Sequence, residues 1–155
     1  MSDPGLPARL RPALPFVAVG AACVVAGGLV AAVTAPAPTE HGSWAAAYLV
    51  LVGGVAQIAL ALGQSWLAPA APSRRLLAGE YVAWSLGNAA VLIGTLAEVP
   101  AVVDIGGALL VAALAIFAIA VRGGRRHWAL LVYRALVVLM LVSIPVGLVL
   151  DRVRG

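Results

Sequence analysis

Two charged residues, Glu80 and Arg134, lie inside long apolar runs, where an ionised side chain is costly. Glu80 is seven residues after Ser73, and Arg134 is seven residues after His127. If both runs are helices that enter a membrane from the same side, both charges lie about 10 Å deep. A carboxylate and a guanidinium at equal depth can pair, so that neither is left alone in a low dielectric. We therefore expect a Glu80–Arg134 ion pair.

Other states of these two charges stay open. In one alternative, Arg134 reaches the membrane surface by itself, and Glu80 is solvated or protonated. A proton-relay role for Glu80 is less favoured, since no chain of further acidic residues continues across the membrane.

Three amide side chains also fall within apolar runs. Gln57 and Gln64 are seven residues apart, close to two turns of a helix, so they share a face. Gln57 and Asn88 lie near the middle of neighbouring runs, where their amides can hydrogen-bond to each other. Such bonds hold membrane helices together, at roughly 0.6–2 kcal/mol each. The alternative is that Gln57, Gln64 and Asn88 line a site for a small solute or an ion.

No catalytic or metal-binding arrangement emerges from the remaining residues. His41 and His127 flank runs on opposite sides, about 30 Å apart if those runs cross a membrane, so they cannot share one metal or haem iron. Cys23 is the single cysteine, which excludes an intrachain disulfide and a cysteine-based zinc site. Phosphate-binding loops, metalloprotease and hydrolase motifs and paired catalytic carboxylates are also missing from the sequence. We predict no catalytic residue and no metal site, and an enzyme is not favoured.

The apolar runs that carry these residues dominate the composition. Of the 155 residues, 63% are hydrophobic and only 10% are charged, and the mean hydropathy is +1.07. A soluble domain of this size could not bury such an excess, so a soluble enzyme and a disordered chain are excluded. Five runs are long enough to cross a bilayer as helices, and they lack the alternation of barrel strands. They are residues 13–35, 43–68, 76–97, 102–121 and 128–150.

The sequence therefore predicts an all-α, polytopic membrane protein with a bundle of five transmembrane helices. An arm of residues 1–12 precedes a single membrane domain of residues 13–150, and a short tail of residues 151–155 follows it. The first run is interpreted as a retained helix, because its apolar stretch exceeds that of a signal peptide.

The arginines predict how the helices are oriented. With five spans, seven of the ten basic residues fall on one side, and cytoplasmic loops carry the excess of such residues. We expect a cytoplasmic N-terminus and an outer C-terminus, with the arginines near anionic lipid headgroups. This explains the net charge of +4 without a nucleic acid, and the lack of lysine is typical of a GC-rich bacterial genome. The seven are Arg9, Arg11, Arg74, Arg75, Arg122, Arg125 and Arg126.

Small residues follow one another along the first run. Gly20, Cys23, Gly27 and Ala31 recur at steps of three and four, which gives a smooth stripe where another helix can approach closely. The stripe packs either within the chain or against a second copy or a larger membrane complex. Asp104 is expected to cap the helix of residues 102–121.

Several segments resemble part of the haem–copper oxidase catalytic-subunit superfamily and its small truncated membrane relatives. In that family, a histidine that opens a helix ligates a haem, so the resemblance implies haem binding at His41. The sequence has only two histidines, and they are far apart, so a copper centre is not expected. The resemblance covers residues 41–121. Its motifs are His-Gly-Ser-Trp at 41–44, Gly-Gly-Val-Ala-Gln at 53–57, Leu-Gly-Gln at 62–64, Trp-Ser-Leu-Gly-Asn at 84–88 and Asp-Ile-Gly-Gly-Ala-Leu-Leu at 104–110.

Together these features favour a small integral membrane protein of a bacterial plasma membrane that acts as a non-enzymatic accessory or structural subunit without a cofactor. One alternative is a redox protein associated with haem or quinone. Another is an oligomeric transporter of a small solute or an ion.

Overall fold

The computed structural model describes residues 10–70, 72–124 and 128–154, with the backbone alone from residue 147 onward. These residues are almost entirely helical and contain no strand, which confirms the all-α prediction. Five helical stretches are long and apolar enough to cross a membrane. They are Arg11–Thr34, Glu40–Leu67, Arg74–Leu96, Pro100–Ala120 and Trp128–Val146.

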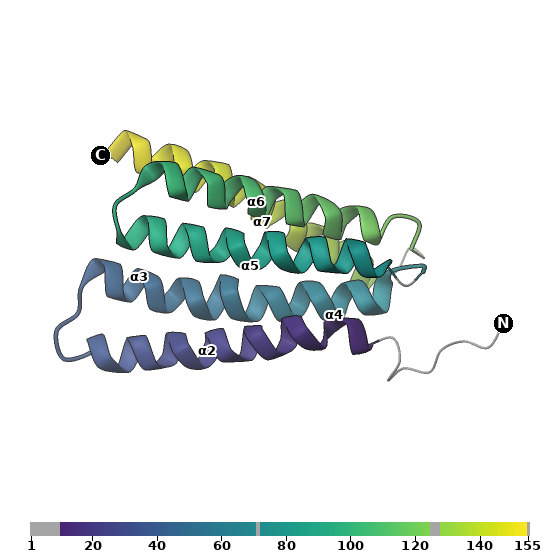
Figure 1. Cartoon of the computed structure of the whole chain (residues 1–155), viewed down its shortest axis with the longest axis horizontal. Helices are drawn as coiled ribbons and strands as arrows, with labels where there is room; N and C mark the ends of the chain where they lie inside the picture. Colours follow the sequence, from purple (N-terminus) through teal and green to yellow (C-terminus); the bar gives the residue numbers. More distant parts are fainter. Residues whose placement is uncertain (1–9, 71, 125–127, 155) are drawn as a thin grey trace. The chain divides into compact units, whose positions relative to one another are not determined.

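The chain divides into two compact units, Met1–Trp66 (unit 1) and Leu67–Gly155 (unit 2). Within the described residues of unit 1, a short 3-10 helix η1 (Arg11–Ala13) leads into α2 (Leu14–Thr34). The returning helix has three parts: α3 (Glu40–Tyr48), η2 (Leu49–Ala56) and α4 (Gln57–Leu67). Unit 2 contains α5 (Arg74–Leu96), α6 (Pro100–Ala120) and α7 (Trp128–Arg154) (Figure 1).

Glycines let the two helices of unit 1 approach closely. A Cβ atom on Gly27 would lie 2.7 Å from Cγ2 of Val50 and 2.8 Å from the carbonyl oxygen of Ala46. A Cβ atom on Gly20 would meet Ile58 at 2.7 Å. The first part of the predicted small-residue stripe therefore packs against the returning helix of its own unit.

The middle of the returning helix, η2, is a π-helix of eight residues. A π-helix bonds residue i to i+5 and is rare, so most examples are single-turn insertions in an α-helix. Here it contains Gly53 and Gly54, which are both buried. A Cβ atom on Gly54 would lie 2.5 Å from Cγ2 of Val24, so the widened turn depends on glycine where it meets α2.

In unit 2, α5 and α6 form an antiparallel hairpin that also packs through glycines. A Cβ atom on Gly106 would lie 2.7 Å from the amide nitrogen of Val91 and 2.8 Å from the carbonyl oxygen of Gly87. Trp84 and Phe117 contact each other edge to face, with ring centroids 6.1 Å apart. Helix α7 packs against α6. Among the described side chains of α7, the buried ones are Leu130, Tyr133 and Val137, spaced by three and four residues.

The helix ends match the predicted boundaries to within a few residues, with two local differences. Thr39 caps α3 by accepting a hydrogen bond from the amide of Gly42 at 3.1 Å, so the helix begins at Glu40 rather than at Ser43. The expectation that Asp104 caps α6 is wrong. Helix α6 begins at Pro100 after Val99, which makes no side-chain cap, and Asp104 lies more than a turn inside the helix. Proline is well suited to a first helical position, so Pro100 is the sequence signal for this helix start.

Candidate functional site

The side chain of Gln57 is buried within unit 1 and ties its two helices together. It is 2% exposed, and its Nε2 donates a hydrogen bond of 2.8 Å to the carbonyl oxygen of Phe16 on α2. A carbonyl oxygen has two lone pairs, so a carbonyl inside a helix can accept this additional bond. Gln57 is also the first residue after the π-helix, so the bond lies at the point where ordinary α-helix resumes.

The other two amides lie on different helices. Gln64 is buried in α4, seven residues after Gln57. On α5, Nδ2 of Asn88 donates a hydrogen bond of 2.9 Å to the carbonyl oxygen of Trp84 one turn earlier. Gln57 and Asn88 therefore each donate a hydrogen bond to a backbone carbonyl of the same unit. A hydrogen bond between Gln57 and Asn88 stays a prediction.

Asn88 and the neighbouring Ser85 carry the clearest unsatisfied polar atoms of α5. Oδ1 of Asn88 and Oγ of Ser85 are both inaccessible to solvent, and neither has a hydrogen-bond partner in the part of the chain that the structure describes. Residues three apart on a helix lie on one face. Two such atoms on one face of a membrane-spanning helix make this face a candidate for contact with a polar ligand.

Glu80 is buried completely in α5, with an exposed fraction of 0%. Tyr133 is 4% exposed, whereas the side chain of Arg134 is exposed. The structure therefore places Tyr133, rather than Arg134, on the buried side of α7, and the Glu80–Arg134 ion pair stays a prediction.

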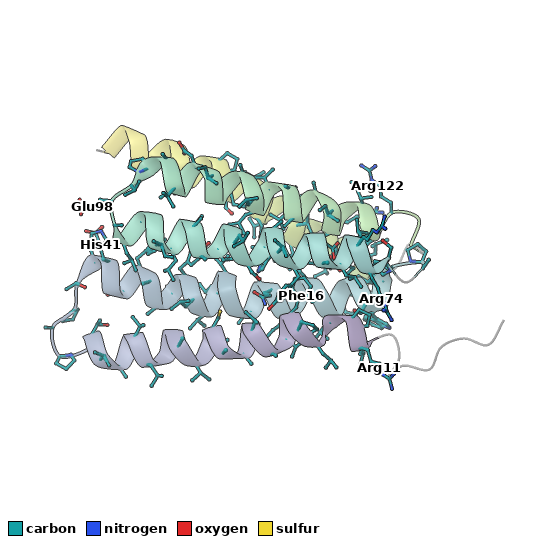
Figure 2. All side chains as sticks on the ribbon, in the orientation of Figure 1. Arg11, Phe16, His41, Arg74, Glu98 and Arg122 are labelled. Atoms are coloured by element: carbon teal, nitrogen blue, oxygen red, sulfur yellow. The ribbon has the colours of Figure 1, made fainter. Side chains whose placement is uncertain are left out.

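His41 lies in the first turn of α3, with an exposed side chain, and Figure 2 shows it at one end of unit 1. The other histidine, His127, is outside the described residues. An axial haem ligand works in a pocket whose polarity and access the protein controls, and an exposed imidazole on a helix end does not provide one. Among the described residues, no group of three His, Cys, Asp or Glu side chains could hold a metal ion. Haem binding at His41 stays a prediction.

No protein-family model matches the chain, and no curated protein and no solved structure is significantly similar to it. The resemblance to the haem–copper oxidase superfamily therefore stays a prediction that depends on the short motifs alone.

Sequence reasoning missed two features of these sites. The π-helix has no signature that distinguishes it from a continuous apolar helix, although the Gly53–Gly54 pair is an indication in retrospect. The second feature is Tyr133, which is buried beside the exposed Arg134 and was not predicted. Its spacing from Leu130 and Val137, three and four residues, would have placed it on the buried face of α7.

Proposed function

We propose that this chain is a multi-pass membrane protein that serves as a non-enzymatic accessory or structural subunit of a membrane assembly. The hydrogen bond from Gln57 to the carbonyl of Phe16 carries the proposal. A polar side chain at membrane depth is a candidate for substrate handling, but here the amide nitrogen joins two helices. Helix-to-helix bonding of this kind supports a structural role rather than a transport path through unit 1.

The surfaces of the helices support the same role. Large apolar side chains on the outer faces of α2 and α7 are more than half exposed, as suits contact with lipid or with helices of another protein. In contrast, the inner faces of the helices contain glycines at which neighbouring helices approach closely. On α2 these residues include Val25, Leu29 and Val33, and on α7 they include Leu131, Val132, Val138, Leu139 and Val142.

The charged ends of each unit favour an orientation with the N-terminus in the cytoplasm of a bacterial cell. In unit 2, Arg74 and Arg122 lie at one end of the α5–α6 hairpin and Glu98 lies at the other (Figure 2). In unit 1, Arg11 and His41 lie at opposite ends. Arginine is enriched on the cytoplasmic side of a membrane, so we assign the arginine ends to the cytoplasm.

Isolation from native membranes in a mild detergent tests the subunit role. A chain tagged at its N-terminus is expected to co-purify with a membrane protein in a fixed molar ratio. If α7 contacts the partner, tryptophan at the exposed positions Leu131, Val138 and Val142 should reduce the amount of partner recovered per chain. Tryptophan at three exposed positions of α2 is the matched control. Recovery of the chain alone from native membranes, at all detergent concentrations, would contradict the proposal.

Transport of a small solute or an ion by an oligomer is the second candidate. It is favoured by the buried polar atoms of Ser85 and Asn88 that have no hydrogen-bond partner among the described residues. Flux through proteoliposomes that is lost in Asn88→Leu would support it. Equal flux in the variant and the parent would exclude Asn88 from the path.

A further inference from the structure

Arg134 lies on an exposed face of α7 among apolar neighbours. Leu131 is three residues before it, and Val138 and Val142 are four and eight residues after it. These three side chains are 65%, 57% and 57% exposed, and the side chain of Arg134 is exposed as well. Residues three and four apart lie on one face of a helix, so these four residues form a single surface, the α7 face.

The charge of Arg134 is set inside the apolar part of the helix. Arg134 belongs to the candidate membrane span Trp128–Val146 and is about 9 Å along the helix axis from Trp128. In contrast, Arg74 begins α5 and Arg122 follows α6, at helix ends where lipid phosphates are within reach. A charged side chain within the apolar layer is costly, and such residues usually pair with an opposite charge.

The described carboxylates of this chain are poorly placed to meet the α7 face. Glu80, which the sequence predicts as the partner of Arg134, is completely buried on α5. Glu40 begins α3 and Glu98 follows α5, so both lie at helix ends, and Asp104 lies near the end of unit 2 that carries Glu98. A second copy in the same orientation therefore has no exposed carboxylate at the depth of Arg134 among its described residues.

We propose that the α7 face docks a transmembrane helix of another protein, and that a carboxylate of that helix pairs with the guanidinium of Arg134. This inference rests on the proposed function as a subunit and names the chemistry of the partner. A guanidinium presents parallel N–H donors that match the two oxygens of a carboxylate. Within the apolar layer such a pair is screened less than at the surface, so it fixes the partner helix at one position along α7.

A synthetic transmembrane peptide tests this pairing in lipid vesicles. The probe is a leucine–alanine helix with one glutamate about 9 Å below the membrane surface, and leucine replaces the glutamate in the matched peptide. Association with the labelled full chain is measured by energy transfer in phosphatidylcholine vesicles. We expect the glutamate peptide to bind about three- to thirty-fold more tightly than the leucine peptide, as for other polar contacts between membrane helices.

Substitutions of arginine then locate the contact. Arg134→Leu should abolish the preference for the glutamate peptide, and Arg134→Gln should weaken it because the charge is lost. Arg122→Leu is the matched control, since Arg122 is also exposed but follows α6 rather than lying within a span, and it should keep the full preference. If Arg134→Leu does not fold, Arg134→Gln provides the same comparison.

Two results would overturn the proposal. One is equal binding of the two peptides to the parent protein, which would mean that lipid phosphates hold the guanidinium. The other is a preference that appears only in Glu80→Gln, which would mean that Glu80 occupies Arg134 within the chain.

The subunit role itself is tested separately, by isolation from native membranes. Recovery of the chain alone would contradict the subunit role whatever the peptides show. A partner in a fixed molar ratio, together with equal binding of the two peptides, would contradict the pairing at Arg134 alone.

Discussion

The amide nitrogen of Gln57 lies 2.8 Å from the carbonyl oxygen of Phe16, a residue 41 positions earlier in the chain. This bond joins the start of α4 to the start of α2, directly after a π-helix. The bond therefore fixes the returning helix, which contains the π-helix, at one position along α2. Contacts at glycine set the distance between the two helices, and the amide sets their position along each other.

Replacement of Gln57 by Met should therefore destabilise the protein. The variant keeps the length of the side chain but loses the donor, and hydrogen bonds between membrane helices contribute about 0.6–2 kcal/mol. We expect a loss of about 1 kcal/mol in the free energy of unfolding, measured by titration with a denaturing detergent. Leu62→Met, an exchange at an exposed position of α4, is the control and should change little. Equal free energies of unfolding of the two variants would contradict a structural role for Gln57.

Two adjacent glycines on α2 should respond in opposite ways to the same substitution. Gly27→Ala would bring a Cβ atom to 2.8 Å from the carbonyl oxygen of Ala46, a backbone atom that cannot move alone. We expect a loss of about 1–3 kcal/mol, as for other overpacked sites. A Cβ atom on Gly28 would have nothing within 4 Å, so Gly28→Ala should be neutral or stabilising by up to about 1 kcal/mol.

Unfolding titrations of these two variants also test where the small-residue stripe makes its contacts. If Gly28→Ala is the more damaging of the pair, the face of α2 that contains Gly28 packs against something, and the packing described for Gly27 is wrong.

The loop between α5 and α6 stores a small strain that glycine would relieve. Glu98 has φ of 55°, a left-handed conformation that is costly for residues with a Cβ atom. The amide of Val99 donates a hydrogen bond of 2.8 Å to the carbonyl oxygen of Gly94, and the amide of Glu98 donates one of 3.3 Å to the carbonyl oxygen of Thr95. Together these two bonds form a Schellman motif. Glu98→Gly should stabilise the protein by about 0.5–1 kcal/mol.

Thermal unfolding of Glu98→Gly and Glu98→Ala separates this backbone effect from the loss of the charge. Alanine also has a Cβ atom and removes the carboxylate, so it should not stabilise. An equal gain in both variants would assign the effect to the charge.

The π-helix leads to a prediction about deletions. Removal of Leu51 from η2 should convert the segment into an α-helix and preserve the faces on both sides, because a π-helix behaves as an α-helix with an inserted residue. Removal of Ile105 from α6 should instead rotate one part of that helix by about 100° and misplace its glycines. Both residues are 61% exposed, so the two deletions are matched.

We expect the Leu51 deletion to remain folded in detergent, as judged by circular dichroism and by a single peak in gel filtration. The Ile105 deletion should aggregate. A folded Ile105 deletion together with an aggregated Leu51 deletion would show that η2 is not an insertion.

The spans could be predicted from sequence because hydrophobic length is a property of each run taken alone. The described helices end within a few residues of the prediction, apart from the start of α3, where the cap at Thr39 adds a turn, and the end of α7, which continues to Arg154. The pairing of side chains depends instead on how each helix is rotated. A shift of one residue turns a helix by about 100°, which is the difference between Arg134 and Tyr133 on α7.

The glycine contacts could be predicted in part, less fully than the helix spans but better than the pairing of side chains. The stripe of Gly20, Cys23 and Gly27 is visible in the sequence, but its partner is not, because the same pattern serves contacts within a chain and between chains. The close approaches to Val50 and Ile58 identify the partner as the returning helix of unit 1.

The placement of residues on the two sides of the membrane is the central claim, and cysteine labelling in whole cells tests it most directly. With Cys23 replaced by alanine, single cysteines are introduced at Arg11, Glu40, Glu98 and Arg122, which are all exposed. We predict that a membrane-impermeant maleimide labels the Glu40 and Glu98 positions in intact cells, and the Arg11 and Arg122 positions only after permeabilisation. Labelling of Arg122 and Glu98 from the same side would contradict a membrane-spanning α6 and the account built on it.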